Sequence, residues 1–106
     1  MTRIGCCVVV TAAVLAGTAD AGAAEQVGVA NCDAFLTQYE ACINTKMPQN
    51  VRALHQKEVD QWRRRWIEAG MKDPSFKKSD LGLGEVCKNT RMLATPMVEM
   101  FGCSFQ

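Results

Sequence analysis

Four of the six cysteines are the residues of this chain best suited to chemistry, and their spacing decides which chemistry; the other two, Cys6 and Cys7, lie in the N-terminal segment, residues 1–24. Nine residues separate Cys32 from Cys42, and fifteen separate Cys87 from Cys103. Metal sites usually place cysteine ligands two to four residues apart, and thiol-redox sites use a C-x-x-C pair. Neither spacing occurs among these four residues, so we expect all of them to form structural disulfides.

Methionine offers a second candidate chemistry, a thioether site for a soft ion such as Cu(I). Met97 and Met100 stand three residues apart and share one face of a helix, and reduced cysteines would complete the ligand set. Methionine is also an ordinary filler of helical cores, and the chain has no repeated methionine motif. We therefore expect no cofactor, and we keep copper handling as an alternative function.

Catalytic residues are sparse. His55 is the single histidine, and no nucleophile stands near it in the sequence. A hydrolytic site needs a nucleophile, a base and an orienting group, and no known catalytic signature is present. The sequence therefore predicts that the protein is not an enzyme.

Trp62, Arg63 and Trp66 form a candidate partner-binding surface, because tryptophan and arginine are common at protein interfaces. The simpler interpretation makes the two tryptophans core anchors, four residues apart on one helix. The partner would be an unknown protein. Nucleic acid is not expected, because the formal net charge is only +1.

Residues 1–24 have the layout of a secretory signal peptide. They begin with a short positive segment, continue with no charge from residue 4 to residue 17, and end among small residues. A membrane span needs ~20 apolar residues, so this stretch is short for one. We expect cleavage near Ala24, a periplasmic or secreted product, and no membrane span in the mature chain.

The remaining residues, 25–106, form one predicted domain of about 80 residues, which is small for a core to stabilise without disulfides. Apolar residues recur at helical spacing, and strand alternation is lacking. We expect an all-α fold, either a small three-helix bundle or a helical hairpin stapled by two disulfides. The predicted helices cover about 32–46, 48–70 and 83–101, with a loop at 71–82 and Asn31 as the first N-cap.

The predicted inner faces follow the same periodicity. The first helix would bury Phe35, Leu36, Tyr39 and Ile43. The second would bury Val51, Leu54, Val59, Trp62, Trp66 and Ala69. The third would bury Val86, Thr90, Leu93, Met97 and either Met100 or Phe101.

Helix length limits which cysteines can pair. Cys32 and Cys42 would lie ~15 Å apart on one helix, beyond the ~7 Å limit between bridged Cα atoms, and Cys87 and Cys103 are likewise separated. Both bridges must therefore join the first helix to the third. Parallel helices favour Cys32–Cys87 with Cys42–Cys103, whereas antiparallel helices would give Cys32–Cys103 with Cys42–Cys87. One bridge must use an unwound end at 102–103.

Two resemblances can be stated. The run from Cys32 to Ile43, followed by the segments Lys46–Pro48, Gln61–Trp62 and Phe101–Cys103, resembles small exported bacterial proteins with four cysteines and no assigned function. The C-x9-C spacing is also similar to that of twin C-x9-C helical proteins. The first resemblance implies a stapled scaffold. We expect a non-catalytic structural or protein-binding module, with copper handling or periplasmic chaperone activity as alternatives.

Overall fold

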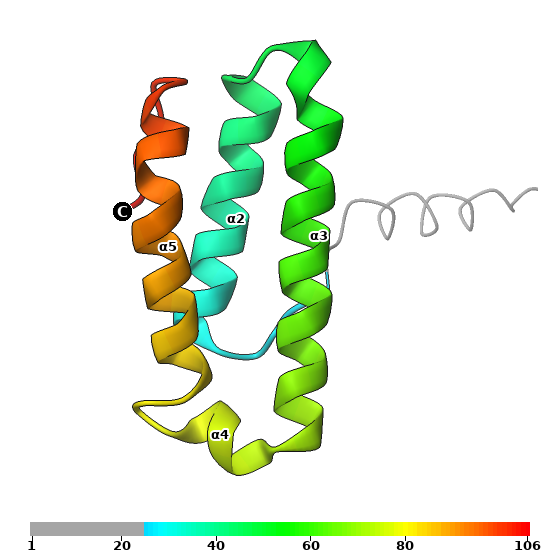
Figure 1. Ribbon diagram of the computed structural model, residues 1–106, viewed down its shortest axis with the longest axis vertical. Helices are drawn as coiled ribbons and strands as arrows, with labels where there is room; N and C mark the ends of the chain where they lie inside the picture. Colours follow the sequence, from blue (N-terminus) through cyan, green and yellow to red (C-terminus); the bar gives the residue numbers. More distant parts are fainter. Residues whose placement is uncertain (1–24) are drawn as a thin grey trace, which may run out of the picture.

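The computed structural model describes residues 25–106, which form four helices and no strand. The helices are α2 (Ala30–Thr45), α3 (Gln49–Lys72), α4 (Pro74–Lys78) and α5 (Leu83–Glu99). Helices α2 and α5 run in the same direction, and α3 runs in the opposite one (Figure 1). The predicted all-α, disulfide-stapled fold is confirmed. The expected signal peptide at 1–24 lies outside the described residues.

Two disulfides join α2 to the α5 region, one at each end of the pair. Cys32 bridges to Cys87, with Cα atoms 5.1 Å apart, and Cys42 bridges to Cys103, with Cα atoms 6.0 Å apart. This is the pairing favoured for parallel helices. The second bridge does use an unwound end, because α5 stops at Glu99 and Gly102 adopts a φ of +88°.

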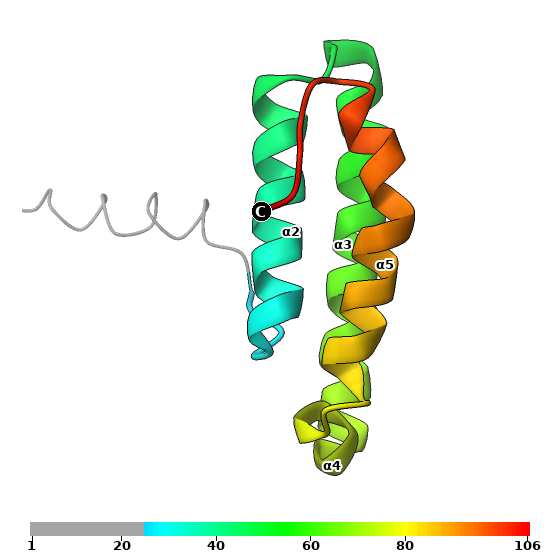
Figure 2. The same cartoon turned by 90° about the vertical axis from the view of Figure 1, so that its left-hand side faces the viewer.

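The last residues turn back along α2 after Gly102 (Figure 2). The Phe105 ring packs on Phe35, with ring centroids 5.0 Å apart. The backbone N–H of Gln106 donates to the Gln38 side chain at 2.7 Å. The C-terminal segment therefore covers part of the aromatic core and belongs to the folded domain.

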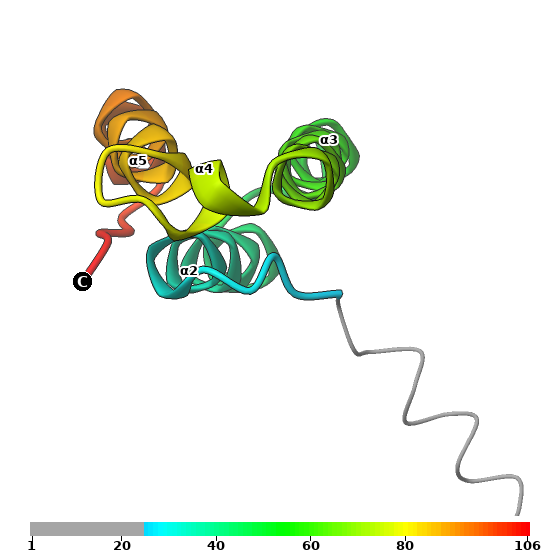
Figure 3. The same ribbon diagram turned by 90° about the horizontal axis from the view of Figure 1, so that it is seen from below.

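Helix α2 is the central element, because α3 and α5 both pack on it (Figure 3). Its predicted inner face is confirmed, since none of the four side chains exposes more than 1% of its surface. The described core consists of Val27, Cys32, Phe35, Leu36, Tyr39, Cys42, Ile43, Met47, Val59, Trp66, Leu83, Cys87, Ala94 and Val98.

The start of α2 differs from the prediction. The helix begins at Ala30, so Asn31 lies inside it and is not the N-cap. The carboxylate of Asp33 instead accepts hydrogen bonds from the backbone N–H groups of Val27 (2.7 Å) and Gly28 (3.0 Å). Asp33 thus holds the lead-in segment against the first turn, where a negative charge is favourable.

Helix α4 lies in the segment that was predicted to be a loop. Asp73 caps it by accepting from the backbone N–H of Phe76 at 3.1 Å, and Pro74 occupies the first turn, where its missing N–H has no helical partner. Seen from below, α4 spans the space between the ends of α3 and α5 (Figure 3). The helix closes that end of the molecule.

Helix α5 buries a different face from the predicted one. Its buried residues are Leu83, Cys87, Ala94 and Val98. Of the predicted inner residues, Leu93 is 82% exposed, Met100 78% and Val86 38%. The reason is covalent: Cys87 must face α2 to reach Cys32, and the neighbouring residue Val86 then points ~100° away around the helix. Leu54 of α3, also predicted to be buried, is exposed.

Candidate functional site

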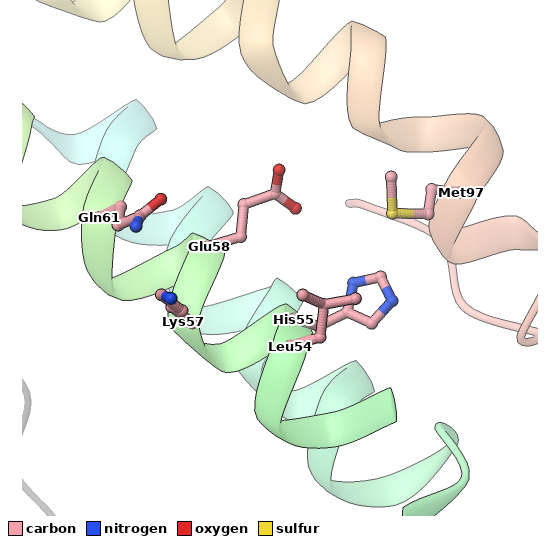
Figure 4. A pocket seen from close by; sticks show the side chains of 6 residues that line it. All are labelled: Leu54, His55, Lys57, Glu58, Gln61 and Met97. Atoms are coloured by element: carbon pink, nitrogen blue, oxygen red, sulfur yellow. The ribbon is translucent and has the colours of Figure 1, made fainter. Parts of the chain in front are cut away.

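An open pocket of about 480 Å³ lies between α3 and α5. Figure 4 shows His55 and Glu58 extending from α3 toward Met97 on α5. The pocket is lined by Leu54, His55, Lys57, Glu58, Gln61 and Met97. This concave surface combines apolar side chains with a carboxylate, an amine, an amide and the single histidine of the chain.

A three-residue hydrogen-bonded cluster stands where this pocket meets the core. The Tyr39 hydroxyl lies 2.9 Å from Nδ1 of His55 and 3.3 Å from Sδ of Met97. A thioether sulfur only accepts, so the single phenolic hydrogen goes to Met97 when both contacts are hydrogen bonds. His55 then donates its Nδ1–H to the phenolic oxygen. In the neutral ring, Nε2 retains a free lone pair.

Burial and a nearby carboxylate hold the Tyr39 phenol in its neutral form. Removal from water, and secondarily the charge of Glu58, raise the pKa of Tyr39 from 10.0 to about 12. Both effects disfavour the phenolate. At neutral pH Tyr39 is therefore a hydroxyl that donates and accepts hydrogen bonds, and it fixes the positions of His55 and Met97.

The proposed partner-binding residues of α3 are directed into the molecule. Trp66 is buried, and the Trp62 ring packs on Phe35 with centroids 5.5 Å apart. The two indoles are parallel, with centroids 6.2 Å apart. Arg63 is engaged by Glu40 of α2. These residues thus come together around the α2–α3 contact, where Trp66 is buried and Trp62 and Arg63 are partly buried.

The pairing of Glu40 with Arg63 is a contact that sequence reasoning missed. Arg63 donates to both of its oxygens, and Gln56 Nε2 donates to Oε2 at 2.9 Å. Burial alone would raise the pKa of Glu40, but the hydrogen bonds from Arg63 and Gln56, together with the Arg63 charge, lower it below 4.5. No local pattern marks such a pair, because its members are 23 residues apart.

The four cysteines of the described part of the chain are all oxidised, so none offers a thiolate to a metal. Within residues 25–106, no group of three or more His, Cys, Asp or Glu side chains has the arrangement to hold an ion. The copper-site hypothesis combined Met97 and Met100 with reduced cysteines. Because these cysteines form disulfides, they supply no thiolate ligands to such a site. The disulfides are typical of an oxidising environment.

The fold and the site together define a small all-α protein in which two disulfides hold α5 against α2 and a pocket opens between α3 and α5. Among residues 25–106, no helix is both long enough and apolar enough to cross a membrane. Comparisons with protein-family models, with curated proteins and with solved structures found no match.

Proposed function

We propose that this protein is an exported, non-catalytic helical module that binds a protein chain through the open face formed by α3 and α5. One observation carries the proposal. The α5 region is tied to α2 by both disulfides, yet its second apolar face is exposed at Val86, Leu93 and Met100. Uncovered apolar surface beside a pocket commonly marks a protein interaction site.

The binding face replaces the one expected around Trp62, Arg63 and Trp66. It consists of Val86, Thr90, Leu93 and Met97 of α5 and of Met100, the C-cap residue that follows the helix; these five are named here the α5 stripe. Leu54, which is 68% exposed, extends it across the pocket onto α3. A disulfide-stapled backbone suits such a role, because a rigid surface loses little conformational freedom when it binds.

Export is the second part of the proposal. Residues 1–24 would direct the chain to the periplasm or the medium and be removed there, and the two disulfides support an oxidising destination. Intact mass of the exported chain, with and without reduction and alkylation, tests this part. We expect loss of the leader, two disulfides and no alkylated thiol. A full-length chain with free thiols would contradict export.

Site-specific photo-cross-linking in the producing cells tests the binding part. A photoreactive residue at Leu93 should give a discrete protein adduct. The same residue at Leu81 is the matched control, because Leu81 is equally exposed at 83% but lies outside the stripe. Absence of an adduct at position 93, or equal adducts at both positions, would overturn the binding role.

A second candidate function, copper handling, is favoured by the convergence of His55 and Met97 on Tyr39. Imidazole nitrogen and thioether sulfur are both ligands of Cu(I). Titration of Cu(I) against a competing chelator would compare the wild type with Met97→Leu and with the exposed control Met92→Leu. Uptake that is unchanged by Met97→Leu would exclude this site.

A further inference from the structure

The α5 stripe has the spacing of a coiled-coil seam. Its members, Val86, Thr90, Leu93, Met97 and Met100, follow one another at intervals of four, three, four and three residues. This alternation keeps one face of a helix toward a partner helix over successive turns. The stripe runs over ~21 Å, since each of the fourteen steps rises ~1.5 Å.

The helices of the same chain leave this stripe open. Helix α5 turns its other face to α2, and it packs less extensively on α3, where the pocket opens between them. Within the stripe Thr90 and Met97 are half-buried, and Met97 accepts a hydrogen bond from the Tyr39 hydroxyl. The ends-on view places α3 and α5 on the same side of α2 (Figure 3). A helix seated between them, opposite α2, would complete a four-helix arrangement.

We propose that the occupant of this face is a second copy of the chain, which places its own α5 antiparallel against the first. This inference rests on the proposed binding role of the α5 stripe. In the antiparallel register centred on Leu93, the two Leu93 side chains meet at the twofold axis. Val86 of one copy, seven residues before Leu93, then faces Met100 of the other, seven residues after it.

Charge favours a second copy as the occupant. The stripe has no charged member, and its exposed flank carries the uncharged residues Asn89 and Pro96. The α3 wall of the pocket carries one base and one acid, Lys57 and Glu58, which balance each other. Charges at such flanking positions normally select one partner and reject others, including a second copy. The formal net charge of the chain is only +1, so two copies approach without appreciable long-range repulsion.

The composition of α5 does not suit a lipid surface. Helices that bind membranes are rich in lysine and arginine on the polar face. Helix α5 has two basic residues, Lys88 and Arg91, balanced by Glu85 and Glu99.

An isologous dimer also uses each apolar contact twice, so Leu54 and the five stripe residues of each copy contribute twelve side chains.

The test is the molar mass of the exported, disulfide-intact chain by sedimentation equilibrium from about 1 μM to about 1 mM. The wild type should pass from the monomer mass to twice that value. Leu93→Glu should weaken association at least about tenfold, because it places two carboxylates at the axis. Leu81→Glu is the matched control, with the same substitution at the same exposure, and should associate like the wild type.

A cysteine variant tests the register. Leu93→Cys should form an interchain disulfide on mild oxidation, because the two positions meet at the twofold axis, whereas Leu81→Cys should not. A wild type that stays monomeric throughout the range overturns the inference. So does a dimer that persists in Leu93→Glu. A monomeric protein that still gives a Leu93 adduct with another protein would overturn self-association and leave the binding module standing.

Discussion

Arg63 and Glu40 are joined by two hydrogen bonds between α3 and α2. Nη2 of Arg63 lies 2.9 Å from Oε1 of Glu40, and Nη1 lies 3.1 Å from Oε2. Both side chains are largely shielded from solvent, at 12% and 22% exposure. Two-point pairing of this kind gives both geometric specificity and strength. The pair therefore fixes the register of α3 on α2.

Arg63→Met should lower the free energy of unfolding at pH 7 by about 1–3 kcal/mol, because Glu40 would be left shielded and poorly partnered. Since the folded state lowers the pKa of Glu40, the stabilisation is present above the ordinary value of 4.5 and is lost as pH falls through the folded-state value. Urea unfolding at pH 7 and pH 3 measures this effect. The control is Arg64→Met, an exposed neighbour. An equal loss in both variants would contradict the assigned role.

Tyr39→Phe should cost about 1 kcal/mol at pH 7 through the lost hydrogen bonds to His55 and Met97. The pKa of Tyr39 is raised in the folded state. The contribution of this pKa shift to the free energy of unfolding is therefore complete below pH 10 and is lost as pH rises from 10 toward 12. Tyr39 is the single tyrosine, so tyrosinate absorbance follows it alone. A midpoint at the ordinary value of 10.0, without unfolding, would show that the phenol is accessible.

Removal of either disulfide should lower the free energy of unfolding by about 4 kcal/mol in the chain-entropy model, because the bridges span 55 and 61 residues. The paired variants are Cys32→Ala/Cys87→Ala and Cys42→Ala/Cys103→Ala. Alanine avoids an unpaired hydroxyl in the core. Guanidinium unfolding of each variant gives the loss. A loss below about 1 kcal/mol for either bridge would contradict the model.

Two glycines at the start of α5 should respond oppositely to alanine. At Gly82 a Cβ would overlap the backbone carbonyl of Phe76, so Gly82→Ala should cost more than about 2 kcal/mol. At Gly84 a Cβ would make ordinary contacts with Val29 and Asn31, at 3.7 and 3.8 Å. Gly84→Ala should stabilise α5 by about 0.5 kcal/mol. Thermal unfolding of both variants compares them. Equal effects would contradict the close approach of Phe76.

The three long helices were predictable because helical periodicity acts over short distances, and helix length showed that both bridges join the first helix to the third. The choice between the two pairings was not settled by the sequence, because it depends on whether those helices run parallel or antiparallel. The buried face of α5 was not predictable either, because this helix carries two apolar faces. Periodicity alone identified the apolar face that contains Leu93 and Met100, and this face is exposed in the structure. The signal that could have corrected it was Cys87: a cysteine bridged to α2 must lie on the inner face.

The candidate site was less predictable than the fold. The Tyr39–His55–Met97 cluster joins residues from three helices, and its ends lie 58 positions apart in the sequence. The pairing of Glu40 with Arg63 likewise depends on how α3 lies on α2. Composition and local spacing contain no signal for such contacts. For this reason Arg63 was assigned to a partner-binding surface, although in the structure its guanidinium pairs with Glu40.

Both disulfides connect α2 with the α5 region, and neither includes α3 or α4. A single peptide-bond cleavage anywhere between residues 49 and 82 would therefore produce two fragments that remain covalently joined at two points. The nicked molecule would keep α2 against α5, and with it the exposed α5 stripe. This arrangement confers tolerance to proteolysis that a single uncrosslinked chain of the same size would lack.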